Sequence, residues 1–412
     1  MTSFQALMRS PPNGWLRAAA IVLISLSMLL GVTRMRDKTE DATYRDRGDA
    51  YSEHIVRNTV INDIAGKEHT GGSLIWTKGY EDPNLKTNPH RYDYAPDGTK
   101  RYYSNRGAQA AFYTGIARIG PATFLAHSDA YFEVFRFVNC LMLTVCLAGF
   151  FAFTLGTGWK PLAAAAVMSV SSGVALFGAN LYFFYWLMFL PLLAAPLLTG
   201  RDERLYIAAA FVGGLANFAV HYEFATTFTL MWVLPVILTR YDRVMAMLRL
   251  GALVFAAVCA SFAIDIVLHL LSVMAIEQVD MAHASALVFE KLKMRVASLD
   301  NHVPPPFTLG FVKSVLYRWS DPAFHIEDIV SVSRFVVLVV FAALCLRDRS
   351  TAWRLAAGWA VATYASWYVL AYQHSMQHYA YDAMLFTCTV ALVTVLRLFA
   401  RRLREPWVPI QR

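Results

Sequence analysis

The sequence predicts an all-α polytopic membrane protein with about ten transmembrane helices and a long non-cytoplasmic first loop. Of its 412 residues 57% are hydrophobic and 16% charged, a balance typical of membrane proteins rather than of soluble domains. The forty residues between Lys160 and Arg201 contain no Asp, Glu, Lys or Arg. One helix of that length would measure about 60 Å, roughly twice the thickness of a hydrocarbon core, so this stretch predicts two spans.

The positions of the cysteines and of the basic residues limit the kinds of site and partner that we expect. All five cysteines fall inside apolar runs, where they act as small hydrophobic residues, so we expect neither a disulfide nor a metal–thiolate site. The formal net charge is +8, and its basic clusters lie between predicted spans. Anionic lipid headgroups are the natural partners of such clusters. We therefore expect contact with membrane lipids and no nucleic acid binding.

The chain divides into five parts. Residues 1–33 form a cytoplasmic tail and the first span, 34–136 a non-cytoplasmic loop with amphipathic or interfacial helices, 137–276 transmembrane helices 2–7, 277–328 a second non-cytoplasmic loop, and 329–412 transmembrane helices 8–10 with a basic cytoplasmic tail. The first span runs from about Trp15 to Val32, and Arg17 lies near enough to its end to snorkel. No small-x-small cleavage pattern follows, which indicates an anchor that is not removed.

The orientation follows from the short connections. The remaining apolar runs cover about 137–158, 161–177, 181–199, 205–220, 224–239, 250–275, 329–346, 355–371 and 380–396. With the N-terminus inside, every inside connection carries Lys or Arg, whereas the short outside connections near Asn180, His221 and Tyr372 carry none. This asymmetry is the positive-inside pattern, and it predicts that both termini are cytoplasmic.

One further apolar segment, Gly107 to Ala126, would reverse every later loop if it crossed the bilayer. Arg118 and Pro121 lie in its interior, and the reversed topology would place the arginine clusters outside. We therefore interpret this segment as an interfacial or re-entrant helix.

The first loop contains the strongest candidate for a catalytic carboxylate. Between Ala50 and Ile64, apolar residues recur at helical spacing and predict an amphipathic helix against the membrane or the bundle. Asp49 directly precedes this helix. It either caps the helix by accepting from backbone N–H groups, or acts as a general base beside a lipid-carried substrate. Both interpretations fit the sequence.

Other ionisable residues gather at predicted outer ends of spans. The segment NFAVHYEF places His221 and Glu223 in a very short hairpin, where ionisable groups are functional candidates by default. The alternative is that Glu223 pairs with a basic residue of the outer cap. Asp265 and His269 lie four residues apart in the seventh span, which also fits a polar contact between helices.

The last outer connection reads YQHSMQHYAYD, in which His374, His378 and Asp382 are spaced by four and share one helix face. This spacing can hold a divalent metal, but hydrogen bonding to phosphate or sugar, or packing in a polar interior, also explains it. No metal site or cofactor is therefore assigned, and a divalent cation stays open. Arg318 in the second outer loop could hold a phosphate, although a cation near headgroups needs no substrate to explain it.

The first loop resembles that of the glycosyltransferase C superfamily of polyprenyl-phosphate-sugar-dependent membrane enzymes. GDAYSEHIVRN is similar to the superfamily's first-loop acidic motif, and YYSNRG is similar to the Tyr-rich segment later in the same loop. The resemblance implies that Asp49 is the catalytic acid position. The sequence departs from the motif at Ala50, where a second acid would stand, and Glu53 lies one helical turn further on.

These features together predict a membrane glycosyltransferase of cell-surface polysaccharide assembly in the bacterial inner membrane. It would move a sugar from a polyprenyl-phosphate donor to a glycan or lipid acceptor on the non-cytoplasmic face. Asp49 would be the base, and the expected substrate-binding residues are Tyr103, Arg106, His221, Glu223, Arg318, His374 and His378. Two alternatives remain: a surface-polysaccharide polymerase or ligase, and a transporter or flippase of lipid-linked glycans, which would need charged or broken helices near the bilayer midplane.

Overall fold

The structure is a computed structural model and is mostly helical. It describes residues 11–39, 50–66, 74–77, 99–155, 159–169, 171, 174, 177–199, 202–296, 307–320, 322–326, 330–337, 339, 343 and 351–370. Two segments, Ser128–Phe151 and Val244–Glu277, are helices long and apolar enough to cross a bilayer. The second has 34 residues and measures about 51 Å, so it exceeds the thickness of a hydrocarbon core.

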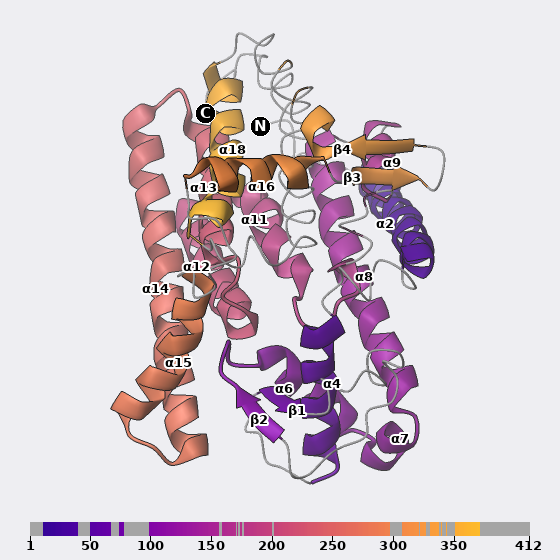
Figure 1. Cartoon of the computed structure of the whole chain (residues 1–412). Helices are drawn as coiled ribbons and strands as arrows, with labels where there is room; N and C mark the ends of the chain where they lie inside the picture. The colour runs from indigo at the N-terminus through magenta and orange to yellow at the C-terminus, as the bar shows by residue number, and fades with distance from the viewer. Residues whose placement is uncertain are drawn as a thin grey trace.

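Most of the helices form a bundle (Figure 1). Its members are α2 (Pro11–Thr39), α8 (Ser128–Leu155), α9 (Trp159–Ser169), α11 (Leu190–Thr199), α12 (Glu203–Val220), α13 (Ala225–Arg240), α14 (Val244–Glu277) and α18 (Thr351–Leu370). Helix α2 packs against α8 and α9, α12 packs against α14, and α13 packs against α14 and α18. Helices α12 and α13 match the predicted segments 205–220 and 224–239 to within two residues.

Helices α2 and α9 approach each other closely at Gly31. A Cβ atom at this position would lie 2.3 Å from the Cβ of Ser169, so a larger residue could not be accommodated without a shift of backbone. Ile24, Met28 and Val32 bury the same side of α2. The first predicted span is thus one helix, and it is longer at both ends than the apolar run.

The predicted first loop forms a layer at one end of the bundle, at the bottom of Figure 1. This first-loop layer consists of α4 (Ala50–Ile64), β1 (Leu74–Thr77), β2 (Thr99–Tyr102), α6 (Ala108–Ala117) and α7 (Pro121–Ala126). Strands β1 and β2 pair antiparallel, with Leu74 opposite Tyr102. The prediction of an all-α chain is therefore wrong in detail, because short strands accompany the helices. Within Gly107–Ala126 the helix breaks between α6 and α7, and neither piece is long enough to span a bilayer.

Helix α4, which the sequence predicted as an amphipathic helix against the membrane or the bundle, is buried on all sides over most of its length. Every residue from Ser52 to Val60 is buried, including Glu53, Arg57 and Thr59. Helix α4 packs against α6 and β1, and two ion pairs link it to α8. The apolar spacing identified one buried side. Polar residues between the apolar positions, such as Glu53 and Arg57, are also buried because they pair with Arg136 and Asp129 of α8.

Within the described residues, the apolar stretch after Lys160 forms helices shorter than the two predicted spans. Helix α9 has 11 residues and α11 has 10, shorter than the predicted spans at 161–177 and 181–199. Between them residues 179–184 make a buried turn, followed by a 3-10 helix, η4 (Tyr185–Phe189). The side chain of Asn180 accepts a hydrogen bond from the backbone N–H of Tyr182 at 2.8 Å, a local bond that competes with helix formation.

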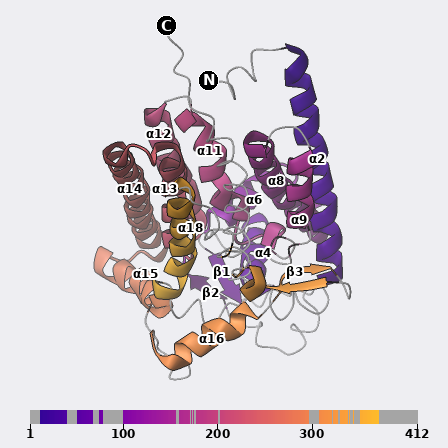
Figure 2. The same cartoon turned by 90° about the horizontal axis from the view of Figure 1, so that it is seen from above.

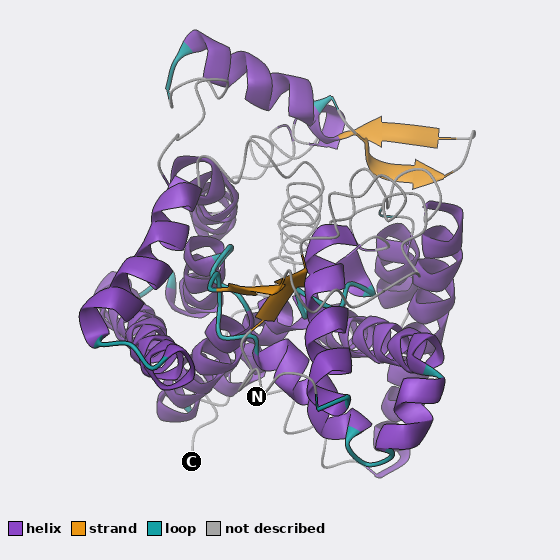
Figure 3. Cartoon of the chain, turned by 60° about the horizontal axis from the view of Figure 1, so that its bottom comes forward, coloured by secondary structure: helices purple, strands orange, loops and turns teal. Residues whose placement is uncertain are grey.

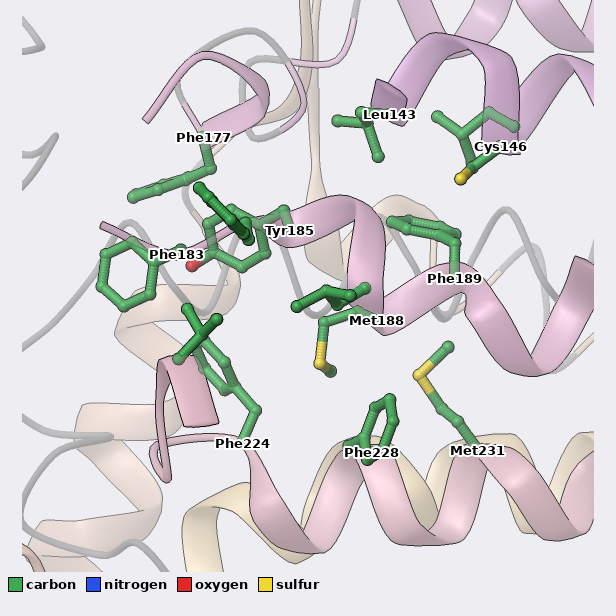
Figure 4. Close-up of a cluster of buried hydrophobic side chains, with 14 of the residues drawn as sticks. Leu143, Cys146, Phe177, Phe183, Tyr185, Met188, Phe189, Phe224, Phe228 and Met231 are labelled. Carbon is green, nitrogen blue, oxygen red and sulfur yellow. The ribbon is translucent and has the colours of Figure 1, made fainter. Parts of the chain in front are cut away.

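This turn and η4 carry an aromatic cluster into the core (Figure 4). Phe183, Tyr185 and Phe189 lie between Leu143 of α8 and Phe228 of α13. Phe184 has a φ of 43°, in the left-handed region that few non-glycine residues adopt. Asn180, which the sequence placed in a short non-cytoplasmic connection, is therefore buried in the interior of the protein.

The described helices of the second long polar segment pack mainly on the bundle, and Tyr103 of the first loop contacts the cluster that α14 and α15 share. Helix α15 (Met281–Val296) packs back along α14, and α16 (Leu309–Trp319) lies on the outside of the bundle near α18 (Figures 1 and 2). Strands β3 (Pro322–Ile326) and β4 (Val330–Ser333) form a second antiparallel pair, well away from β1 and β2 (Figure 3). Strand β4 replaces the first residues of the span predicted at 329–346.

Candidate functional site

Seven side chains connect the first-loop layer to the bundle and are called the polar junction here: Asn105, Arg106, Tyr182, Tyr222, Glu223, Asp265 and His269. They come from the loop before α6, the turn before η4, the turn between α12 and α13, and the buried side of α14. Two branches of hydrogen bonds start from the neighbouring residues Asn105 and Arg106.

The first branch runs from Asn105 to Glu223. The amide Nδ2 of Asn105 donates to Tyr182 Oη at 2.7 Å, and Tyr182 Oη donates to Glu223 Oε1 at 3.3 Å. The Oδ1 of Asn105 accepts from the backbone N–H of Gly107, whose φ of 75° suits a residue without a Cβ. The turn that starts α6 therefore also orients Asn105 toward Tyr182, which donates to the buried carboxylate of Glu223.

The second branch runs from Arg106 to His269. Arg106 Nη1 donates to Asp265 Oδ1 at 2.5 Å, and Tyr222 Oη donates to Asp265 Oδ2 at 2.7 Å. Tyr222 Oη also lies 3.1 Å from Nδ1 of His269, one helical turn beyond Asp265. The side chain of Asp265 is 0% exposed, whereas that of Arg106 is 31% exposed. Both oxygens of a fully buried carboxylate are thus satisfied, and its cation reaches solvent.

Tyr103 binds α14 further along the same edge. Arg101 Nε lies 2.8 Å from Glu277 Oε1 at the end of α14, and Tyr103 packs against Leu270 and Val273. Burial, reinforced by the hydrogen-bonded carboxylate of Glu277, raises the pKa of Tyr103 well above its usual range. The hydrogen bond to Glu277 uses the phenol in its neutral form as a donor.

His221 and Asn217 lie beside the Glu223 end of the junction. Nδ1 of His221 is 3.9 Å from Glu223 Oε2, and the ring packs against Phe183 and Phe224. The side chain of Asn217 is fully buried, and neither of its amide atoms has a hydrogen-bond partner among the described residues. A buried amide without partners costs about 1–3 kcal/mol per unsatisfied group, which marks this point of the interior as unusual.

The structure brings together part of the predicted site. Arg106 and Glu223 belong to the polar junction, His221 adjoins it, and Tyr103 binds the same edge of α14. Arg318 belongs to α16, and its side chain lies outside the part of the chain that the structure describes. Asp49, His374 and His378 lie outside the described residues, and α4 begins one residue after Asp49.

The partner of Glu53 was missed at the level of sequence. Arg136 donates to this carboxylate from Nε at 3.1 Å and from Nη2 at 2.6 Å, and the backbone N–H of Leu181 donates to it at 3.2 Å. Glu53 is thus fully engaged in joining α4 to α8 and to the buried turn, which makes it a poor substitute for the second acid of the family motif. No local sequence pattern signals this partner, because Glu53 lies in the first turn of α4 and Arg136 is 83 positions further along the chain.

The described residues contain no group of three His, Cys, Asp or Glu side chains placed to hold a metal ion. The candidate ligands for a divalent cation, His374, His378 and Asp382, fall outside those residues.

A scan against protein-family models, a search of curated proteins and a search of solved structures each find no match for this chain. The resemblance to the glycosyltransferase C superfamily therefore rests on the sequence motifs of the first loop.

Proposed function

We propose that this chain is a glycosyltransferase of the bacterial inner membrane, with about ten spans and cytoplasmic termini. It moves a sugar from a polyprenyl-phosphate donor to a glycan or lipid acceptor on the non-cytoplasmic face. The isoprenoid tail confines such a donor to the bilayer, so its phosphate must be met by protein groups near the ends of the spans.

The observation that carries the proposal is the hydrogen bonding of the Arg106 guanidinium. Its guanidinium is anchored to buried Asp265 through Nη1, and no described residue makes a hydrogen bond or ion pair with its Nε or Nη2. A guanidinium edge of this kind matches two phosphate oxygens and binds them bidentately. Its partial exposure lets a headgroup reach it without opening the core.

The two ends of the bundle differ in a way that supports the proposed orientation. Arg240 pairs with Glu203 at 3.1 Å at the end opposite the first-loop layer, where Arg204, Arg243 and Arg249 are also exposed. Basic residues at this end agree with a cytoplasmic side. The first-loop layer and the polar junction then lie on the non-cytoplasmic side, where the donor headgroup is proposed to react.

In the proposed reaction a base takes the proton of the acceptor hydroxyl, and the hydroxyl oxygen attacks the anomeric carbon of the donor sugar. The bond from that carbon to the phosphate oxygen breaks, and polyprenyl phosphate leaves. Asp49 is the proposed base, as the motif implies, and Arg106 stabilises the negative charge that grows on the leaving phosphate. Glu223 and His221, predicted to bind substrate, have side chains only 3% and 0% exposed, so they are proposed to support the site from the interior. His374, His378 and Arg318 are proposed to contribute contacts to the donor.

Transfer of labelled sugar tests this assignment. Membranes that contain the protein would be supplied with a panel of polyprenyl-phosphate sugars, and Asp49→Asn and Arg106→Ala compared with wild type. We expect transfer by wild type with one donor, a loss of about 10²-fold or more in either variant, and little change in the control Arg243→Ala. Full activity in both Asp49→Asn and Arg106→Ala would refute the proposed site.

A second candidate, translocation of a charged lipid-linked glycan, is favoured by a different observation. The turn at 179–184 is non-helical backbone buried inside the bundle, and α14 carries buried Asp265 and His269. Interrupted helices beside buried ionisable groups are typical of transporter binding sites. This candidate predicts movement of the intact donor across the bilayer with no break between sugar and phosphate.

A further inference from the structure

We infer that Asp265 is a positioning residue for an anionic ligand: it fixes the guanidinium of Arg106 so that the Nε and Nη2 edge faces a phosphate group. The inference rests on the proposed function for the identity of the ligand, a phosphate monoester or diester on a lipid. The same chemistry also suits free inorganic phosphate.

The geometry allows Asp265 to orient Arg106 but not to contact the ligand itself. Its carboxylate is 0% exposed, so a ligand cannot touch it without displacing protein. One oxygen accepts from Arg106 and the other accepts from Tyr222. A carboxylate held on both oxygens has a fixed plane, and a charge-assisted bond from that plane orients the guanidinium.

Tyr222 and His269 in turn hold the carboxylate of Asp265 in place. Tyr222 Oη lies between Asp265 Oδ2 at 2.7 Å and His269 Nδ1 at 3.1 Å, and Tyr222 and His269 are both buried. Tyr222 comes from the turn after α12, whereas Asp265 and His269 come from α14. Arg106 comes from the first-loop layer, so the chain of contacts spans three segments that are far apart in sequence.

A purely electrostatic role and a positioning role of Asp265 predict opposite changes in anion affinity when Asp265 is replaced. A negative charge about 3 Å from the guanidinium weakens the attraction of that guanidinium for an anion, so its removal should tighten anion binding. If Asp265 acts by orientation, its removal lets the flexible Arg106 side chain adopt many rotamers, and anion binding weakens. The direction of the change therefore separates the two roles.

The test is equilibrium binding of geranyl phosphate, inorganic phosphate and the neutral alcohol geraniol to the full-length protein in detergent. Wild type would be compared with Arg106→Ala, Asp265→Asn, Asp265→Leu and Tyr222→Phe. Glu203→Gln, which removes the carboxylate from the ion pair with Arg240 at the other end of the bundle, is the matched control. Thermal unfolding of each variant establishes the folded fraction to which the affinities refer.

We expect the affinity for geranyl phosphate to fall several-fold in Asp265→Asn and about tenfold in Asp265→Leu, the factor that corresponds to about 1.4 kcal/mol. Tyr222→Phe should cost about threefold alone and nothing further in the Asp265→Leu background, because both act through one guanidinium. Glu203→Gln should bind as wild type. Parallel losses for inorganic phosphate would identify a free-phosphate site, and losses confined to geranyl phosphate a lipid-headgroup site.

Unchanged or tighter binding in Asp265→Leu, with binding abolished in Arg106→Ala, would overturn the positioning role and leave the proposed function standing. Binding of geraniol and geranyl phosphate with equal affinity by wild type would overturn the phosphate subsite and this inference together. The expected order of affinities without any sugar transfer would support the inference and contradict the proposed function.

Discussion

Glu53 and Arg136 illustrate how single residues hold the first-loop layer on the bundle. Their side chains are 4% and 7% exposed, and they meet through two hydrogen bonds. Removal of one member of a buried pair leaves the other charge without compensation, which costs far more than the loss of an exposed pair. The strength of such a pair depends on burial, which a sequence does not report.

We therefore predict that Glu53→Gln lowers the free energy of unfolding by about 3 kcal/mol, the lower end of the range for buried pairs because Glu133 also binds Arg136. Glu203→Gln, in the more exposed pair with Arg240, should cost at most about 1 kcal/mol. Denaturant unfolding in detergent would compare them. Equal losses would mean that Glu53 is not buried as described.

His54 makes the first-loop layer sensitive to acid. Burial, together with the nearby Arg57 charge, lowers the pKa of His54 to about 4 from its ordinary 6.5. The unfolded chain takes up a proton on this residue below about pH 6.5, while the folded protein does not until about pH 4. Stability from this group is thus complete above pH 6.5 and is lost as the pH falls toward 4.

Between pH 7.5 and pH 4.5 this effect amounts to about 2 kcal/mol of unfolding free energy. We expect His54→Gln, which can still accept from Asn58, to lose correspondingly less stability over that interval. Unfolding curves at both pH values would show it. Identical acid sensitivity of wild type and variant would contradict the buried, neutral histidine.

At the scale of elements, the close approach of α2 and α9 at Gly31 offers a test of packing. We predict that Gly31→Ala destabilises the protein by about 1–3 kcal/mol, because its Cβ would overlap Ser169. At Gly115 in α6 a Cβ would meet nothing within 4 Å, so Gly115→Ala should be neutral or stabilising by up to about 1 kcal/mol. A harmless Gly31→Ala in thermal unfolding would argue against this packing of α2.

Elements with clear end signals were predictable and those shaped by buried partners were not. Helices α12 and α13 follow their apolar runs because charged residues and a short hairpin delimit them. The turn at 179–184 interrupts an apolar stretch of uniform appearance, and its buried position depends on Asn139, which donates to the carbonyl of Asn180 from another helix. The sequence singled out the turn but could not place it in the interior.

The candidate site was predictable in its residues more than in its connections. The sequence singled out Glu223 at the end of a span, Asp265 within a span and Arg106 in the first loop. The pairing of Arg106 with Asp265 joins residues 159 positions apart, and no local pattern encodes such a contact. The part played by Asn105 and Tyr182 was missed, because a neutral polar residue in an aromatic run carries no signal until its partner is known.

At the scale of the whole molecule, the proposed topology places the first-loop layer and the α14–α15 hairpin outside and the Arg240 end inside. We predict that reporter fusions after Gly66 and after Gln278 are active as alkaline phosphatase, while a fusion after Asp242 fluoresces as a GFP fusion. Both reporters depend on the side of the membrane that they reach. The same reporter active at Gly66 and at Asp242 would contradict this orientation.

The measurement that tests the central claim most directly follows the bond between sugar and phosphate in proteoliposomes of the purified protein. The donor would carry one label on the sugar and another on the polyprenyl chain, with an acceptor glycan present. The glycosyltransferase account predicts that the sugar label passes to the acceptor while the lipid label stays in the membrane as polyprenyl phosphate. Two labels that remain joined, whether or not the donor crosses the bilayer, would contradict it.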